Sequence, residues 1–200
     1  MIRLAAMNRL FPIDDPSPPD IPGLRYVAEY LSVADEEAIA RAIDAAAWDT
    51  SWERRRQPYG AAYGNRSAAV AAIPEWGRQL ANRIFAERFS VRPFDQMLVN
   101  EYLPGQGISL HRDYEPYDRT VVSLSLLGAC RMDFRRVADG RRESFVLAPR
   151  SLLVLSDEAR YEWEHGIARR RSDIIEGVRT PRKRRLSVTF RTLKNPPAAD

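Results

Sequence analysis

The chain has 200 residues, 44% of them hydrophobic, which suits a single domain with a sizeable core. It contains no apolar run of membrane-spanning length and no basic-then-apolar leader, so we expect a cytoplasmic protein without a membrane partner. The single cysteine, Cys130, excludes an internal disulfide, and the formal net charge of +4 permits nucleic-acid binding without establishing it.

The N-terminal part predicts an extended lead-in followed by a strand and a helix. Residues 1–20 end in a run with four prolines and three aspartates, which favours extended structure. We expect one domain over residues 21–200, beginning with a short strand at 24–27. Ser32 followed by Asp35 is typical of a helix start. Apolar residues then recur at helical spacing, at Ile39, Ala42, Ile43 and Ala46.

Residues 48–66 differ from their surroundings because arginines alternate with aromatic side chains. Trp52, Arg54 and Tyr59 belong to this segment. Guanidinium groups pair with phosphates and aromatic rings stack on bases, so the segment is a candidate substrate contact. The alternative is a hairpin whose aromatic residues pack on the preceding helix.

From residue 74 onward the pattern changes from one helix to many strands. A second helix is predicted for 74–89, with Pro74 in its first turn. Strands are predicted at 121–127, 131–136, 144–147 and 152–155, and Asp139-Gly140 is typical of a hairpin turn. The fold class is therefore α+β (mainly β). We expect a double-stranded β-helix, or jelly roll, with the two N-terminal helices packed on one sheet.

The two histidines of the chain, His111 and His165, suggest a metal site. Asp113 follows His111 by two positions, and such residues project from the same face of a strand. With His165 from a distant strand, two imidazoles and one carboxylate could meet on one side of a metal. This ligand set leaves coordination positions open and is typical of non-haem Fe(II) oxygenases. A His-x-Asp pair also occurs by chance, and a lone histidine is often structural.

Residues 185–191 predict a strand with one apolar and one polar face. The apolar face carries Leu186, Val188 and Phe190, and the polar face carries Arg185, Ser187, Thr189 and Arg191. The polar face could face solvent. In a barrel it could instead line the interior, where an arginine needs an anionic partner. A dicarboxylate such as 2-oxoglutarate supplies one. Asn100 and Tyr102 share one face of another predicted strand and could donate hydrogen bonds to the same ligand.

Four motifs in this order resemble one known family. They are Asn-x-Tyr at 100–102, His-x-Asp at 111–113, Trp-x-His-Gly-Ile at 163–167 and Arg-x-Ser-x-Thr-Phe-Arg at 185–191. Together they resemble the AlkB family of Fe(II)- and 2-oxoglutarate-dependent dioxygenases, over about residues 21–193. The resemblance implies an enzyme that uses Fe(II), 2-oxoglutarate and O2.

The resemblance also implies roles for single residues. His111, Asp113 and His165 would bind iron. Asn100, Tyr102, Arg185 and Ser187 would bind 2-oxoglutarate, with Arg185 on its distal carboxylate. Arg191 would lie nearer the carboxylate that chelates iron, as part of the catalytic set. Ser187 stands where family members usually have asparagine.

The function implied is oxidative demethylation of N-alkylated bases in DNA or RNA, releasing formaldehyde, succinate and CO2, by a protein expected to be monomeric. Repair members carry an acid two residues beyond the iron aspartate, here Glu115, and a substrate lid where residues 48–66 stand. Glu115 could equally be an exposed loop residue.

Three alternatives stay open. Residues 151–155 and 160–167 also look like the tRNA-modifying members, so a wobble-uridine hydroxylase is the first, and a protein demethylase is the second. A catalytically inactive jelly-roll binding module is the third. The basic runs at 169–171 and 182–184 are expected to be solvated loops. Alternatively, they could contact the phosphates of a nucleic acid.

Overall fold

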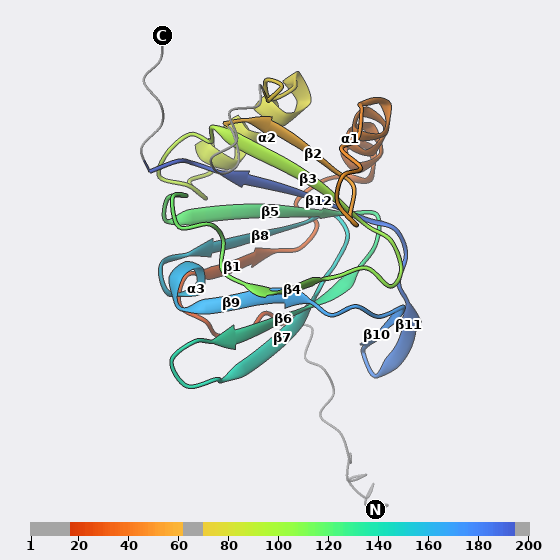
Figure 1. Ribbon diagram of the computed structural model, residues 1–200, viewed down its shortest axis with the longest axis vertical. Coiled ribbons are helices and arrows are strands. Elements are labelled where there is room, and N and C mark those ends of the chain that lie inside the picture. Colours follow the sequence, from red (N-terminus) through yellow and green to blue (C-terminus); the bar gives the residue numbers. More distant parts are fainter. Residues whose placement is uncertain (1–16, 62–69, 195–200) are drawn as a thin grey trace, which may run out of the picture.

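The structure is a computed structural model that describes residues 17–61 and 70–194 (Figure 1). Most of the expected lead-in and residues 62–66 of the candidate lid therefore lie outside the described residues. The strands are β1 (Leu24–Val27), β2 (Arg56–Gly60), β3 (Gln96–Tyr102), β4 (Ile108–His111), β5 (Thr120–Leu126), β6 (Cys130–Arg136), β7 (Arg142–Leu147), β8 (Ser151–Ser156), β9 (Trp163–Ile167), β10 (Ser172–Ile175), β11 (Val178–Pro181) and β12 (Arg185–Arg191). The helices are α1 (Val33–Ala45), α2 (Glu75–Ala86) and α3 (Asp157–Tyr161).

The strands form two main sheets whose pairings are antiparallel. The larger sheet has the order β1-β8-β5-β12-β3-β2, and the smaller has the order β4-β9-β6-β7. Figure 1 shows α1 and α2 beside β2 and β3, at the end of the molecule opposite β6 and β7. This mainly β, antiparallel arrangement agrees with the predicted fold class.

The helices begin where local chemistry favours it. Ser32 caps α1, and the Asp35 side chain completes a capping box with the backbone of Ser32, as predicted. Pro74 precedes α2, which ends at Ala86, three residues before the expected end at residue 89. The short α3 was not expected. Within the described ranges, no helix is long and apolar enough to cross a membrane.

A cluster of buried apolar residues joins the helices to the larger sheet. We call it the helix-side cluster; it includes Ile39, Ile43, Leu80, Ile84, Met97, Val99, Val122, Leu124, Leu152, Val154, Leu186, Val188 and Phe190. Members of β12 alternate within it, as the period of two predicted. The polar face of β12 points the other way, between the sheets, and all seven residues of the strand are buried.

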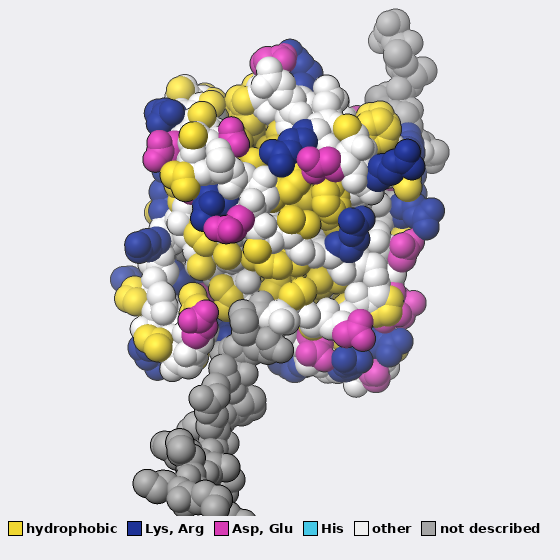
Figure 2. Space-filling view, turned by 180° about the vertical axis from the view of Figure 1, so that it is seen from behind, with side chains coloured by type: hydrophobic (Ala, Val, Ile, Leu, Met, Phe, Trp, Pro, Cys, Tyr) yellow, Lys and Arg dark blue, Asp and Glu magenta, His cyan; other side chains and the backbone are white. Residues whose placement is uncertain are grey.

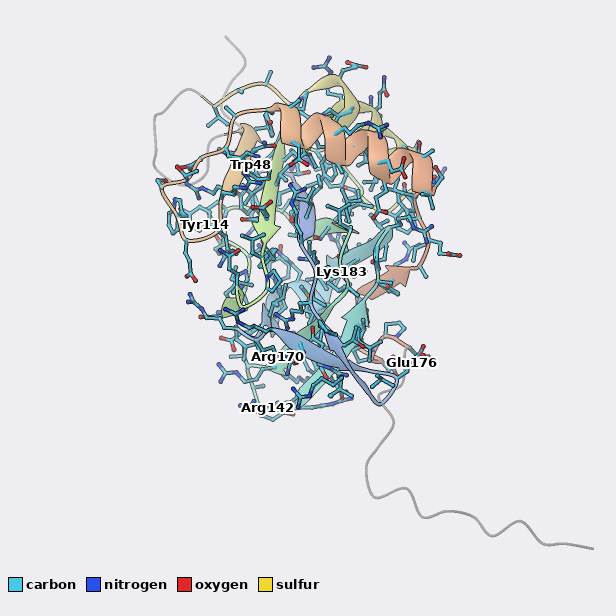
Figure 3. All side chains as sticks on the ribbon, turned by 90° about the vertical axis from the view of Figure 1, so that its right-hand side faces the viewer. Trp48, Tyr114, Arg142, Arg170, Glu176 and Lys183 are labelled. Atoms are coloured by element: carbon cyan, nitrogen blue, oxygen red, sulfur yellow. The ribbon has the colours of Figure 1, made fainter. Side chains whose placement is uncertain are left out.

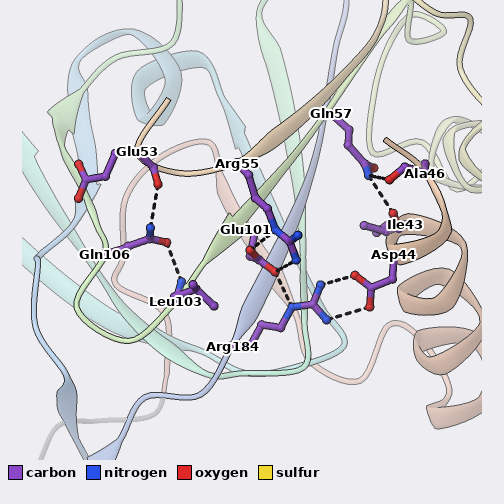
Figure 4. A network of polar contacts seen from close by, with 10 residues as sticks. All are labelled: Ile43, Asp44, Ala46, Glu53, Arg55, Gln57, Glu101, Leu103, Gln106 and Arg184. Carbon is purple, nitrogen blue, oxygen red and sulfur yellow. Dashed lines mark hydrogen bonds and ion pairs between the residues drawn. The ribbon is translucent and has the colours of Figure 1, made fainter. Parts of the chain in front are cut away.

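An ion-pair network on β3 and β12 fixes the same two strands to α1 (Figure 4). The Glu101 carboxylate, whose side chain is 4% exposed, accepts hydrogen bonds from Arg55 (2.7 Å) and Arg184 (2.6 Å). Arg184 in turn pairs with Asp44 of α1 at 2.9 Å. Because Glu101 lies between Asn100 and Tyr102, this network holds the strand that carries both of them.

The two basic runs lie in loops on either side of the β10–β11 hairpin; Arg169, Arg171 and Lys183 are exposed as expected, whereas Arg182 is buried. Asp173 on β10 has a side chain only 1% exposed, and it pairs with Arg182 and with Arg170, both at 2.6 Å. Burial alone would raise the pKa of Asp173, but the hydrogen bonds from Arg182 and from the Arg131 backbone outweigh it and lower that pKa. Figure 3 shows Arg170 and Glu176 toward opposite ends of this hairpin. The expectation of solvation was wrong for Arg182, because a charge run does not reveal a buried partner several residues away.

Candidate active site

A cavity between the two sheets brings together all the residues predicted for metal and cosubstrate. Its polar lining is Asn100, Tyr102, His111, Asp113, Ser123, His165, Arg185, Ser187, Thr189 and Arg191. Its apolar lining is Ile108, Val121, Met132, Leu153, Leu155 and Ile167. Neither histidine is visible on the outer face drawn in Figure 2, where charges of both signs surround an apolar area.

The two histidines and the aspartate meet at one end of this cavity. His111 at the end of β4 pairs with His165 on β9, and their ring centroids are 4.6 Å apart. Asp113 lies beyond the end of β4, with its Oδ2 atom 3.5 Å from Nε2 of His165. Nδ1 of His111 lies 2.9 Å from the Ser109 carbonyl oxygen, which can only accept. Nδ1 therefore carries the proton, and Nε2 keeps a lone pair for a ligand.

These groups fit a bound cation. Oδ2 of Asp113 is buried and has no hydrogen-bond partner, which is costly for a carboxylate oxygen unless a cation or donor occupies the site. Burial lowers the pKa of His165 to about 4, so this imidazole is neutral and able to act as a ligand. In the described part of the chain, no three His, Cys, Asp or Glu side chains stand in an arrangement that could hold a metal ion as they are placed. His165 lies next to both other donors, so these three side chains are the candidate ligands, and binding of a metal would require them to move.

Arg191 holds the Asp113 carboxylate in place. Its Nε and Nη2 atoms each donate to Oδ1 of Asp113 at 2.8 Å, and its Nη1 donates to Gln96 at 3.2 Å. Burial alone would raise the pKa of Asp113, but the positive charges of Arg191 and Arg160 outweigh it and keep that pKa well below its usual range. The carboxylate is therefore ionised, with one oxygen engaged by Arg191 and the other turned toward His165.

Arg185 lies at the other end of the cavity without an ionic partner. It is 2% exposed; Nη2 donates to Ser125 at 2.8 Å, and the guanidinium carbon lies 5.2 Å from the centre of the Tyr102 ring. Its Nε and Nη1 atoms are buried without a hydrogen-bond partner. A carboxylate is the anionic partner that suits a buried guanidinium with unused donors. Burial raises the pKa of Tyr102, so its phenol stays protonated and can donate a hydrogen bond.

Small hydroxyl groups form the floor between these two ends. Ser187 lies within 3.0 Å of Ser123, and Ser123 lies 3.4 Å from Thr189. Ser187 faces the cavity beside Asn100, its partner across the β12–β3 pairing. The position that usually holds asparagine in the resembled family therefore keeps a polar side chain that faces the cavity.

The residues predicted to contact the substrate do not gather at this cavity. Arg54 lies beside it, with its guanidinium carbon 5.3 Å from the centre of the Tyr102 ring. Tyr59 instead packs on the helix-side cluster, since it stands opposite the buried Met97 in the β2–β3 pairing. Trp52 is 51% exposed, and the Arg56 guanidinium lies over its ring. Glu115 is an exposed loop residue that pairs with Lys194. The structure does not support cavity contacts for Trp52, Tyr59 or Glu115.

Sequence reasoning missed two residues near the metal end. Arg160 of α3 is 3% exposed, contributes to the low pKa of Asp113 and donates to the Tyr114 carbonyl oxygen at 2.8 Å. Gln96 accepts from Arg191. The available signal for Arg160 was its place five residues before His165, in the stretch 160–167 that resembles the tRNA-modifying members.

A double antiparallel sheet that encloses two imidazoles, a carboxylate and a buried unpaired arginine defines a non-haem iron oxygenase. The profile of the 2OG-Fe(II) oxygenase superfamily matches residues 26–191. The chain therefore belongs to this superfamily and, being 30% identical over 174 residues to the alpha-ketoglutarate-dependent dioxygenase alkB homolog 7 of Bos taurus (82% of this chain, 76% of the relative), to the AlkB family within it. It is a 2-oxoglutarate-dependent dioxygenase that uses Fe(II), 2-oxoglutarate and O2.

Two further relatives resemble the chain in sequence, and one solved structure shares its fold. The chain is 32% identical over 210 residues to the alkylated DNA repair protein ALKBH8 homolog of Arabidopsis thaliana, covering 90% of this chain and 61% of the relative. It is 29% identical over 212 residues to the tRNA (carboxymethyluridine(34)-5-O)-methyltransferase alkbh8 of Xenopus tropicalis, covering 90% of this chain and 33% of the relative. The structure of OsALKBH1 shares the fold, with a TM-score of 0.66 at 21% identity, covering 86% of this chain and 99% of that one.

Proposed function

We propose that the enzyme removes N-alkyl groups from bases of DNA or RNA by oxidation, releasing formaldehyde, succinate and CO2. His111, Asp113 and His165 hold the iron. The proposal depends on two groups in one cavity that contain buried atoms without hydrogen-bond partners: the Asp113 carboxylate, through Oδ2, and the Arg185 guanidinium. The first suits a cation and the second suits a carboxylate. When bound, Fe(II) and 2-oxoglutarate supply the oxidation of the target carbon–hydrogen bond with O2.

The protein's own part is to position these groups. Arg185 and Tyr102 bind the distal carboxylate of 2-oxoglutarate, and Asn100 and Ser187 donate hydrogen bonds along its length. Arg191 fixes Asp113 so that a single oxygen is offered toward the metal. The apolar lining limits water in the cavity, which strengthens each of these electrostatic contacts.

The names of several relatives support a nucleic-acid substrate. The Arabidopsis relative is named an alkylated DNA repair protein, and other relatives are named for RNA or DNA demethylation. The lid proposed for residues 48–66 would contribute Arg54, which already lies beside Tyr102. The chain carries a net charge of +4, which suits an anionic polymer.

The test is mass spectrometry of methylated DNA and RNA oligonucleotides incubated with the enzyme, Fe(II), 2-oxoglutarate and ascorbate. We expect loss of one methyl mass together with stoichiometric succinate. A His111→Ala, Asp113→Ala double variant should form neither product, and Glu176→Gln on the exposed hairpin serves as the matched control. Succinate formation that is equal in the double variant and the parent would overturn the assignment of the metal ligands.

Hydroxylation of a tRNA wobble uridine is the second candidate. The specific observation in its favour is that Glu115, the acid expected of a repair enzyme, lies outside the cavity and pairs with Lys194. The Xenopus relative is also named for a tRNA uridine modification, although this chain spans only 33% of its length. A gain of one oxygen mass on a tRNA anticodon fragment, without methyl loss from any oligonucleotide, would favour this reaction over demethylation.

A further inference from the structure

We propose that Tyr114 and Tyr161 form a stacking platform for the nucleotides next to the target base. Tyr114 directly follows Asp113, and Tyr161 ends α3 four residues before His165. Each tyrosine therefore stands next to a different part of the metal end of the cavity. The inference rests on the proposed nucleic-acid substrate and extends it to residues outside the cavity.

Both rings are partly exposed, and Tyr114 is held edge-on against Tyr117 with ring centroids 6.0 Å apart. Tyr114 is 44% exposed and Tyr161 is 36% exposed, although large aromatic side chains usually bury more of their surface. Figure 3 shows Tyr114 at the edge of the molecule. The ring surface that stays exposed on these two tyrosines suits stacking with unstacked bases.

Buried and exposed arginines join the two tyrosines into one unit. Arg160 is 3% exposed; it donates to the Tyr114 carbonyl oxygen at 2.8 Å, and its guanidinium carbon lies 5.0 Å from the centre of the Tyr161 ring. Arg112 donates to the Tyr161 carbonyl oxygen at 2.9 Å. The loop after the iron aspartate and the end of α3 are thus tied together, so the platform keeps a fixed relation to Asp113.

The charges around the platform favour nucleic acid over an apolar partner. Arg112 is exposed, and Lys194 lies with its amine 5.7 Å from the centre of the Tyr161 ring while pairing with Glu115. Cations next to aromatic rings allow a phosphate to be bound beside each stacked base.

Fluorescence anisotropy with labelled single-stranded DNA and RNA of one sequence tests the platform on the whole chain. Tyr114→Ala and Tyr161→Ala should each weaken binding about tenfold, and Tyr→Phe at either position should restore it, because stacking needs the ring and not the hydroxyl. Phe85→Ala, which removes an exposed ring from α2, is the matched control and should bind like the parent. Thermal melting and 2-oxoglutarate affinity should be unchanged in all variants.

The outcomes separate the platform from the proposed reaction. Parent-like binding by both alanine variants overturns the platform, even where the parent oxidises nucleic acid. Weakened binding by the alanine variants, together with no oxidised base in any oligonucleotide, supports the platform and overturns the proposed reaction. An absence of nucleic-acid binding by the parent, or binding only to a peptide panel, overturns the platform.

Discussion

Replacing Arg185 by methionine should weaken the binding of 2-oxoglutarate and, at the same time, raise the stability of the ligand-free protein. In the free protein this guanidinium is 2% exposed and has two nitrogen atoms without partners. Exchange of buried charges for apolar side chains of similar volume is commonly neutral or stabilises by about 1–4 kcal/mol. The Tyr102 ring, 5.2 Å away, offsets part of the cost of the charge. We therefore expect Arg185→Met to raise the unfolding free energy of the ligand-free protein by about 1–2 kcal/mol.

The same substitution should severely weaken 2-oxoglutarate binding. Loss of one partner from a buried charge pair typically costs about 2–5 kcal/mol, because the other charge is left unpaired. At about 1.4 kcal/mol per factor of ten, the dissociation constant should rise by roughly thirty-fold to several thousand-fold. Lysine at this position keeps the charge but not the planar fork, so its affinity should lie between the two.

Two measurements on the same samples test this reasoning. Calorimetric titration of the Mn(II)-loaded protein with 2-oxoglutarate gives the dissociation constant, and urea unfolding of the ligand-free protein gives the free energy. Arg179→Met on the exposed strand β11 is the control and should change neither value. An unchanged dissociation constant in Arg185→Met would refute its role. Lower stability of the ligand-free variant would refute the account of the unpaired charge.

Three further predictions concern the scaffold. Asp173→Asn should lose about 3–5 kcal/mol of unfolding free energy at neutral pH. Because the pKa of Asp173 is lowered on folding, this contribution exists above its unfolded pKa of about 3.9 and disappears as the pH falls through the folded value. Urea unfolding across pH should therefore show the gap to the parent closing in acid, whereas Glu176→Gln should show no gap at any pH. Gly107→Ala would place a methyl group 2.2 Å from the Ile167 carbonyl oxygen, so its melting temperature and Mn(II) affinity should both fall. Burial raises the pKa of the Cys130 thiol, which is 2% exposed, so a disulfide reagent should modify it only after unfolding; fast modification of the native protein would contradict its placement.

The parts of the fold that could be predicted are those where local pattern and tertiary environment agree. Residues 185–191 were expected as one strand, and β12 has these bounds. The cap of α1 at Ser32 is equally local, since the side chains that make it are three residues apart. The faces of β12 were assigned correctly as two sets. The sequence did not show whether the polar set faced solvent or the interior, because burial of that face depends on the second sheet.

The parts that could not be predicted depend on partners far away in the chain. Tyr59 and Arg54 belong to one aromatic and basic segment, yet Tyr59 packs on the helix-side cluster and Arg54 lies beside Tyr102. Their directions follow from the register of β2 on β3, more than thirty residues later, and a shift by one residue would reverse them. Arg182 looked like part of a solvated charge run until Asp173 on the neighbouring strand was placed beside it.

The alternation of β12 explains how the fold tolerates an active site with unsatisfied charges. Leu186, Val188 and Phe190 are each 0% exposed within the helix-side cluster. Burial of such a side chain contributes roughly 1.5–3 kcal/mol, so the three together offset the cost of the buried guanidinium on the opposite face. Because the same backbone carries both faces, a cavity left by Val188→Ala would destabilise the strand and also loosen Ser187 and Thr189. Val188→Ala should thus lower the affinity for 2-oxoglutarate, although the side chain of Val188 lies on the face of β12 that points away from the ligand.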